Sequence, residues 1–250
     1  MSANTRHERI LQILIEKGKA TVAELSASTG VSGKTIREDL EKLEQKGMIR
    51  RFHGGAALAN EGYTGLFPKN APNSRNAEAK AKAAKRALDF VEPGDVIILD
   101  SGSTTLALAR QLENISITVV TNDLFIIGEL AHKDNIRLVV PGGFRYRNQL
   151  VSDHFADFLS GMNIHKAFIS ATGVHPDYGL TIFTQALVSQ KQAMIRNAAE
   201  TYCIVDHTKL NKCALITFAE LSEIRHIITD PDAPEESLEP FEKAGIQLIR

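Results

Sequence analysis

Residues 31–40, VSGKTIREDL, decide how the amino-terminal part of this 250-residue chain folds. Ser32 is a favourable N-cap, because its hydroxyl can accept a hydrogen bond from an otherwise unpaired amide of the first helical turn. Beyond it, Ile36, Leu40 and Leu43 recur at helical spacing and predict one buried face. The stretch therefore predicts a capped amphipathic helix with a polar outer face.

Two further helices are expected before this stretch. Residues 6–17 carry apolar side chains along one side, as a surface helix does. Thr21 and Glu24 then form a capping-box pattern, in which each side chain satisfies an amide near the other, and a short second helix is expected to end near Thr29. A tight turn over 30–32 joins that helix to the capped one.

Residues 48–58, MIRRFHGGAAL, predict two short strands around a turn, because Gly54 and Gly55 can supply the positive φ of a tight hairpin. Three helices with a tight turn before the third, followed by a basic hairpin, are typical of a winged helix-turn-helix. Residues 1–58 hold ten basic and seven acidic side chains, a mild excess that permits contact with phosphate without proving it.

The rest of the chain predicts a different architecture. Residues 59–74 lack an apolar period, are rich in Gly, Pro and Asn, and are predicted to be a linker. From about residue 75, helical patterns alternate with short apolar runs, which predicts a sheet covered on both faces. The fold class is thus a small α+β winged helix-turn-helix domain over 1–58, followed by an α/β Rossmann-like domain with a mainly parallel sheet over 75–250. The predicted strands are 96–100, 117–121, 136–140, 166–172, 202–206, 226–230 and 246–249. The predicted helices are 75–90, 103–112, 123–132, 152–160, 184–199 and 235–244.

Composition argues against several classes of protein. Hydrophobic residues make up 43% and charged residues 24%, as in ordinary globular proteins. Cys203 and Cys213 have no partner ligands at metal-binding spacing, so we expect no disulfide, no metal site and no cofactor. The amino terminus lacks an apolar signal-peptide core, and no apolar stretch approaches the roughly 20 residues that span a bilayer. We therefore expect a cytoplasmic protein without a membrane partner.

The third helix and the hairpin contain candidate DNA contacts. The amino-terminal end of such a helix normally enters the major groove, where Arg37 could bind a guanine edge or a phosphate. The basic hairpin would lie along the backbone or enter the minor groove. A merely solvated charged surface is the alternative, and Glu38 and Glu41 would repel phosphate. The candidates are Ser32, Gly33, Lys34, Thr35, Arg37, Lys42, Arg50, Arg51 and His53.

Segment 96–105 contains a second candidate site. A buried strand ends at Asp100, and residues 101–105, SGSTT, then begin a helix. The amides and partial positive charge at its start form an anion-binding site. Gly102 would let a phosphate approach the backbone, the hydroxyls can donate to it, and Asp100 could accept sugar hydroxyls. Open α/β sheets bind ligands at this edge. The alternative is that the Ser and Thr side chains only cap the helix.

Other polar residues are predicted near the same edge. Asn122 could orient a ligand or cap the following helix, and Gly142 with Gly143 could allow a ligand to approach or could form only a turn. Asp206 and Lys209 could bind a ligand or pair with each other. The candidate ligand residues are Asp100, Gly102, Ser103, Thr104, Thr105, Asn122, Gly142, Gly143, Lys191, Asp206 and Lys209.

These motifs together resemble the DeoR family of transcription regulators. The family signature is a V-S-x-x-T-I-R-R-D-L run, then L-x-x-x-G and a basic residue before H-G-G-A; residues 31–56 match it, with Glu38 in place of the second arginine. Residues 100–105 are similar to the family's D-x-G-T/S-T motif. Further matches fall in family order at Thr121-Asn122, Pro141-Gly142-Gly143, Gly173, Lys191 and Asp206-His207-Thr208-Lys209.

The resemblance covers nearly the whole chain and carries functional implications. It implies a regulator, usually a repressor, of a carbohydrate operon that binds double-stranded operator DNA, responds to a phosphorylated sugar and works as a homo-oligomer. Its sensing domain would be similar to ribose-5-phosphate isomerase. Lys191, taken alone, would be interpreted as a surface lysine, and the resemblance makes it a candidate ligand contact. Some relatives carry a Glu four residues before that lysine, where this chain has Leu187.

A sugar-phosphate isomerase or hydrolase is the alternative function. Asp100 and Asp206 are possible general bases, and His207 is adjacent to the second of them. The sequence contains no organised nucleophile-base set and no dinucleotide-binding glycine fingerprint. We therefore expect a protein that binds its ligand and is not an enzyme. A scaffold that binds only proteins would leave both the basic hairpin and the phosphate-binding loop unexplained.

Overall fold

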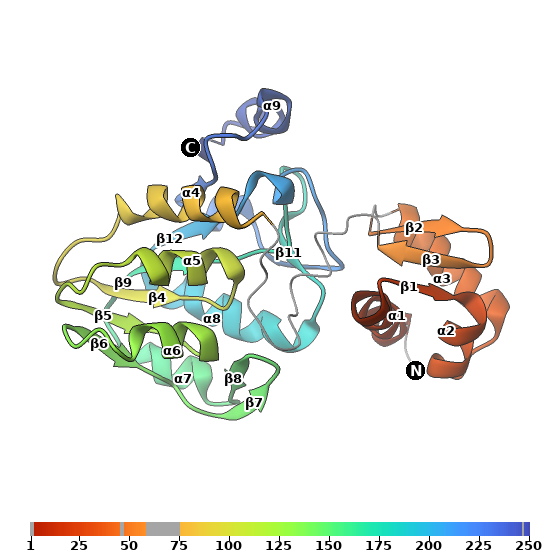
Figure 1. Cartoon of the computed structure of the whole chain (residues 1–250), viewed down its shortest axis with the longest axis horizontal. Coiled ribbons are helices and arrows are strands. Elements are labelled where there is room, and N and C mark those ends of the chain that lie inside the picture. Colours follow the sequence, from red (N-terminus) through yellow and green to blue (C-terminus); the bar gives the residue numbers. More distant parts are fainter. Residues whose placement is uncertain (1–2, 46–47, 59–75, 247) are drawn as a thin grey trace.

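A computed structural model of the chain describes residues 3–45, 48–58, 76–246 and 248–250. A small helical region at the amino terminus lies beside a larger α/β domain (Figure 1). The predicted linker over 59–74 lies outside the described residues. No helix in the described ranges is long and apolar enough to cross a membrane.

The amino-terminal region is a helix-turn-helix with a small antiparallel sheet in the order β1-β3-β2. The predicted capping box is present: Thr21 Oγ1 accepts from the amide of Glu24 at 3.2 Å, and the Glu24 carboxylate accepts from the amide of Thr21 at 2.8 Å. The short strand β1 was not predicted, because it spans three residues that overlap this cap. The elements are α1 (Ala3–Lys17), β1 (Lys19–Thr21), α2 (Val22–Thr29), α3 (Gly33–Gln45), β2 (Ile49–Phe52) and β3 (Gly55–Leu58).

The α/β domain is built on a seven-stranded parallel sheet in the order β15-β14-β12-β9-β4-β5-β6. All seven predicted strands belong to it, although two begin and end earlier than predicted. Its order places β4 and β5 beside each other, so the segments that follow them meet at one edge. The strands are β4 (Val96–Leu99), β5 (Ile117–Val120), β6 (Ile136–Val139), β9 (Ile164–Ile169), β12 (Ala198–Ile204), β14 (His226–Ile228) and β15 (Leu248–Ile249).

Alternation along the strands divides the core into two layers. Ile97 and Leu99 pack with the helices α4, α5 and α6, whereas Ile98 packs with α7 and α8 on the opposite face. The sheet is therefore covered on both sides, as its apolar strands require. The helices are α4 (Ala77–Leu88), α5 (Ser103–Gln111), α6 (Leu124–Leu130), α7 (Phe155–Ser160), α8 (Val188–Asn197) and α9 (Glu235–Lys243).

Two small antiparallel units were not predicted. They are the hairpin β7 (Phe144–Tyr146) and β8 (Gln149–Val151), and a sheet of β10 (Gly173–His175), β11 (Gly179–Ile182) and β13 (Ile216–Ala219). Strands of three or four residues give too little alternation to detect. The predicted helix 184–199 is also corrected: it opens as the 3₁₀ turn η2 (Gln185–Leu187) and ends at Asn197, because β12 begins at Ala198.

Candidate functional site

The outer face of α3 presents its basic side chains to solvent. Lys34, Arg37 and Lys42 are exposed. Ser32 accepts from the amide of Thr35 at 3.2 Å and its hydroxyl lies 3.0 Å from that of Thr35, so both residues shape the start of the helix. Gly33 is half-buried at the same end. Glu38 and Glu41 share the exposed face, as the sequence indicated.

The hairpin carries exposed basic groups of two kinds. Arg50 and His53 are exposed, and no ion pair to either is present among the described residues. Arg51 instead pairs with Glu44 of α3, with 2.6 Å between Nε and Oε2, and its amide donates to the same carboxylate. This pair fixes the hairpin against the carboxyl-terminal half of α3.

A buried carboxylate on the inner side of α3 was missed by the sequence analysis. Asp39, only 2% exposed, accepts from Arg6 Nε at 2.5 Å and lies 2.9 Å from Nε2 of His7. Burial opposes ionisation of Asp39, but the hydrogen bonds from Arg6 and His7 outweigh it and lower its pKa. The network joins α1 to α3. Its signal was a polar residue next to Leu40 on the apolar side of the helix.

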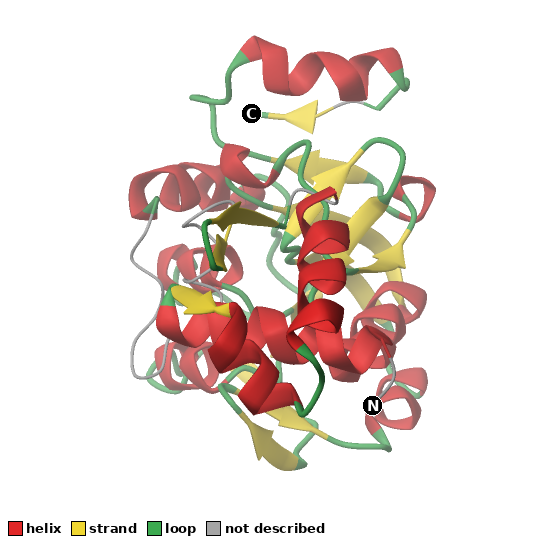
Figure 2. Cartoon of the chain, turned by 90° about the vertical axis from the view of Figure 1, so that its right-hand side faces the viewer, coloured by secondary structure: helices red, strands yellow, loops and turns green. Residues whose placement is uncertain are grey.

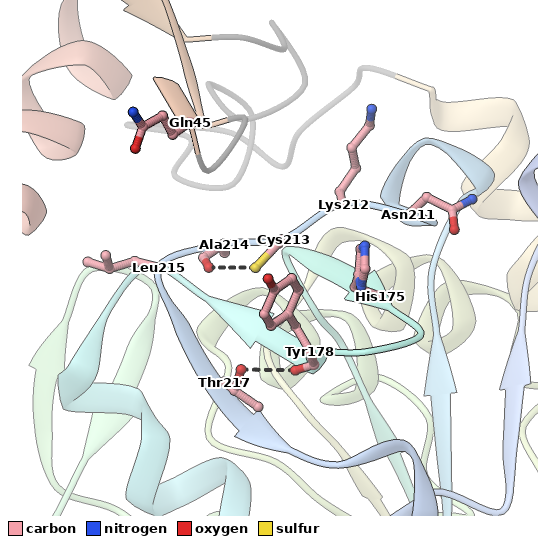
Figure 3. A pocket seen from close by; sticks show the side chains of 9 residues that line it. All are labelled: Gln45, His175, Tyr178, Asn211, Lys212, Cys213, Ala214, Leu215 and Thr217. Carbon is pink, nitrogen blue, oxygen red and sulfur yellow. Dashed lines mark hydrogen bonds between the residues drawn. The ribbon is translucent and has the colours of Figure 1, made fainter. Parts of the chain in front are cut away.

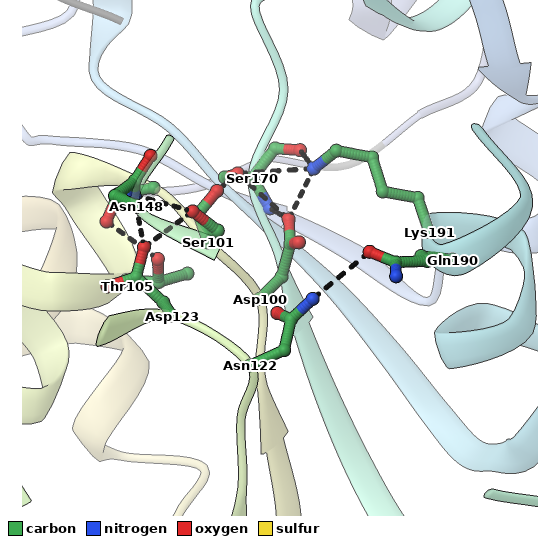
Figure 4. A network of polar contacts seen from close by, with 10 residues as sticks. Asp100, Ser101, Thr105, Asn122, Asp123, Asn148, Ser170, Gln190 and Lys191 are labelled. Carbon is green, nitrogen blue, oxygen red and sulfur yellow. Dashed lines mark hydrogen bonds and ion pairs between the residues drawn. The ribbon is translucent and has the colours of Figure 1, made fainter. Parts of the chain in front are cut away.

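At the carboxyl end of β4, Asp100 forms an ion pair with Lys191 of α8 (Figure 4). Both side chains are buried, so the interpretation of Lys191 as a surface lysine is wrong. Ser170, after β9, donates to Asp100 Oδ2 from its amide and its hydroxyl, each at 2.8 Å, and its carbonyl accepts from Lys191 at 2.8 Å. Asp100 Oδ2 is thus bonded within the protein.

The amino terminus of α5 has no side-chain cap. Its N-cap is Gly102, and Thr105 Oγ1 donates to the carbonyl of Gly102 instead of accepting from an amide. Ser101 donates to Asp123. The alternative in which these hydroxyls cap α5 is therefore wrong. Gly102 is required by packing, because a Cβ there would lie 2.6 Å from that of Ser170.

Asn122 does not cap the next helix. The N-cap of α6 is Asp123, whose Oδ1 accepts from the amides of Phe125 and Ile126, and burial raises the pKa of Asp123. Asn122 is fully buried and its amide group donates to Gln190 Oε1 at 3.1 Å (Figure 4). The sequence analysis missed Gln190, because its pairing with Asn122 spans 68 positions.

Within the described ranges, three buried polar atoms at this edge have no hydrogen-bond partner. They are Asn122 Oδ1, Gln190 Nε2 and Asp206 Oδ2. Leaving such groups unpaired costs on the order of 1–3 kcal/mol each. They supply two acceptors and one donor, which a ligand rich in hydroxyls would satisfy.

Two buried lysines flank Asp206 after β12. Lys209 is 7% exposed and Lys80 of α4 is 3% exposed. Burial lowers the pKa of Lys80 to about 8, although Asp206 opposes the shift, and burial lowers the pKa of Lys209 in the same way. Asp206 Oδ1 accepts from the amide of Thr208, so Asp206 also begins the turn η3 (His207–Lys209).

Lys80 was missed by the sequence analysis, although its spacing carried a signal. It lies three, four and seven residues before the buried Ala83, Ala84 and Ala87, on the same face of α4. Two of the three glycines in the predicted ligand set also have a structural explanation. Gly142 and Gly143 take φ of 78° and 119°, and a Cβ on Gly143 would lie 2.3 Å from the carbonyl oxygen of Val151.

Comparison with known proteins gives matches over both regions. Residues 75–231 match the DeoR C terminal sensor domain, and residues 6–61 match the DeoR-like helix-turn-helix domain. The L-fucose operon activator of Haemophilus influenzae is 32% identical over 248 residues, covering 98% of this chain and 99% of that protein. The glycerol-3-phosphate regulon repressor of Escherichia coli is 28% identical, with 99% of each covered. A ribose 5-phosphate isomerase structure from Methanocaldococcus jannaschii covers 56% of this chain and 55% of its own, at 22% identity and a TM-score of 0.41.

Proposed function

The chain belongs to the DeoR family of transcription regulators, and on that premise we propose that it binds duplex operator DNA and a phosphorylated sugar that controls this binding. The observation that carries the ligand proposal is the uncapped start of α5 beside buried polar atoms without partners. The family includes a relative named as an activator and one named as a repressor. We propose that this chain is a repressor of a carbohydrate operon.

The DNA interface consists of α3 in the major groove and the β2–β3 hairpin on the backbone. Arg37 is exposed one turn into α3, where it reaches a guanine edge with both guanidinium donors. Lys34 and Lys42 neutralise phosphates on either side. Arg50 and His53 contact the backbone from the hairpin. Glu38 keeps phosphate away from its own position, which narrows the part of the helix that approaches the DNA.

The phosphate group of the effector binds at the start of α5. The amides of residues 103–105 and the positive end of the helix attract a dianion. Lys80 and Lys209 bring two buried cations near one carboxylate, Asp206, and that local excess of positive charge favours a phosphate ester. Helix α4, which carries Lys80, packs against α5.

The sugar hydroxyls bind along the strand ends. Asn122 Oδ1 and Asp206 Oδ2 accept from hydroxyls, and Gln190 Nε2 donates to one. Leu187, buried where some relatives have Glu, makes the adjoining surface apolar. We propose that no reaction follows binding; of the two candidate bases, Asp100 already accepts three hydrogen bonds on Oδ2. The protein would act in the cytoplasm as a homo-oligomer, since operators with two half-sites need two reading helices.

Thermal unfolding against a panel of phosphorylated sugars and the same sugars without phosphate tests the ligand. A ligand of the folded state raises the melting temperature, so at least one phosphorylated member should do so and its unphosphorylated counterpart should not. DNA affinity should fall steeply as salt rises, since phosphate contacts release counterions. An unchanged melting temperature with every member of the panel would contradict the proposed effector site. Turnover of a sugar phosphate would support the enzyme alternative.

A further inference from the structure

The two regions of the chain share a hydrophobic cluster. Phe183 and Ala214 of the α/β domain are 4% and 2% exposed, and they pack into the core of the helix-turn-helix region with residues such as Ile10 and Leu14 of α1. Leu215 packs against the same cluster. We call the surface formed by Phe183, Ala214 and Leu215 the seat. Figure 2 views the molecule from the side of the helix-turn-helix region that rests on it.

A polar contact beside the seat continues into α3. The amide of Gln185, in the turn η2, donates to Glu8 Oε1 of α1 at 3.3 Å. The neighbouring Arg6 and His7 of α1 bond Asp39 of α3. Helix α3, the proposed DNA-reading helix, is thus linked to η2 through α1. The contacts that link them are hydrogen bonds and ion pairs.

Both segments of the seat lead directly to the proposed effector site. Gln190 and Lys191 follow η2 on the first turns of α8, and Gln190 bonds Asn122 while Lys191 pairs with Asp100. Lys209 precedes Ala214 by five positions, and the amide of Ala214 donates to the buried Thr181 of β11 at 2.8 Å. A ligand that moves α8 or η3 would therefore move the seat.

We propose that the seat is the contact through which the effector site controls the position of the reading helix. The inference rests on the proposed function. A ligand that pairs Gln190 Nε2 and Asp206 Oδ2 changes the arrangement of α8 and η3, and hence the free energy with which α1 docks on the seat. Docking and ligand binding are then coupled, and each changes the equilibrium of the other.

A pocket between the regions provides a natural reporter. It has a volume of about 470 Å³, and Gln45 of α3 lines it together with Ala214 and Leu215 of the seat (Figure 3). Cys213 lines it and is half-buried, whereas Cys203 is fully buried and burial raises its pKa to about 12. A thiol reagent should therefore report on Cys213. The lining residues are Gln45, His175, Tyr178, Asn211, Lys212, Cys213, Ala214, Leu215 and Thr217.

Thiol labelling of the full chain with Ellman's reagent tests docking. Phe183→Asp places a charge in the seat and should increase the labelling rate of Cys213 about tenfold or more, because the helix-turn-helix region separates. Phe144→Asp is the matched control, since Phe144 is 82% exposed on β7, and its rate should equal that of the wild type. Glu8→Gln weakens the contact with Gln185 without entering the cluster and should give a smaller increase. Wild-type rates of Cys213 labelling in both Phe183→Asp and Glu8→Gln would overturn the proposal that the helix-turn-helix region docks on the seat.

The same measurement tests coupling to the effector site. Gln190→Leu breaks the bond to Asn122 without touching the seat and should accelerate Cys213 labelling at least about twofold. Ser189→Ala, on the exposed side of α8, is the control and should leave the rate unchanged. An unchanged rate in Gln190→Leu would overturn the coupling. The labelling rates are measured without DNA or a sugar phosphate. A failure of the coupling can therefore be distinguished from a failure of the proposed function.

Discussion

The proposed DNA-reading surface and the proposed effector site differ in where their charged side chains lie. On α3 and the hairpin the basic candidate side chains are exposed, come from one continuous stretch and lie over a local apolar core. At the carboxyl edge of the sheet most of them are buried, and they come from segments as distant as 100, 122, 190 and 206. Exposed basic side chains at the first surface, such as Arg37, are available for a partner, whereas buried charges at the second, such as Asp100 and Lys191, pair within the protein. Substitutions should therefore affect binding alone at the first, and stability as well as binding at the second.

The largest effect is expected at the buried ion pair. Lys191→Met leaves Asp100 buried without its cation and should lower the free energy of unfolding of the α/β domain by about 3–5 kcal/mol. Lys82→Met is the matched control, because Lys82 pairs with exposed carboxylates of Glu78 and Asp232 and should change stability little. Denaturant titration measures both, and equal stabilities would contradict the comparison.

Arg37→Ala should weaken DNA binding without affecting folding. Loss of a bidentate base contact should weaken affinity for operator duplex roughly 5- to 150-fold and relax specificity at one base pair. Lys34→Ala should weaken affinity for all sequences alike and reduce the salt dependence. Fluorescence anisotropy with matched and mismatched duplexes distinguishes the two. Arg37 would be only a solvated side chain if its variant bound both duplexes like the wild type.

The effector site should respond to pH through Lys80. Its pKa of about 8 lies below the ordinary value because burial outweighs the attraction of Asp206, so Lys80 loses its charge as pH rises through 8. Because a bound phosphate needs that charge, affinity for the stabilising sugar phosphate should fall about fivefold between pH 8 and 9. Calorimetric titration should show this fall in the wild type and a weak, flat profile in Lys80→Met. Equal affinity at both pH values would remove Lys80 from the site.

The smallest effect is expected at the helix caps, because α2 has a side-chain cap and α5 has none. Thr21→Ala removes the cap of α2 and should lower stability by about 1 kcal/mol. Ser103→Ala, at the start of the uncapped α5, should lower it less, since no capping bond is lost. Paired thermal unfolding curves give the difference. A greater loss in Ser103→Ala would mean that its hydroxyl caps α5 after all.

The same contrast explains what could be predicted from the sequence. Thr21, Ser32 and the apolar period of α3 act within a few residues, so the helix-turn-helix followed from local pattern. The parallel strands followed from apolar runs, and the start of α5 from a run of small polar residues. The partners of those residues did not follow. The pairing of Lys191 with Asp100 spans 91 positions and depends on how α8 crosses the sheet, which no local pattern encodes.

The affinity of the full chain for duplex DNA from the control region of its own gene, measured with and without the stabilising sugar phosphate, tests the account most directly. In the wild type the dissociation constant should change roughly 5- to 150-fold on adding the sugar phosphate. In Thr104→Asp, where a fixed negative charge repels phosphate from the start of α5, it should not change. Equal dissociation constants with and without the sugar phosphate in the wild type, or an undiminished response in Thr104→Asp, would contradict the account.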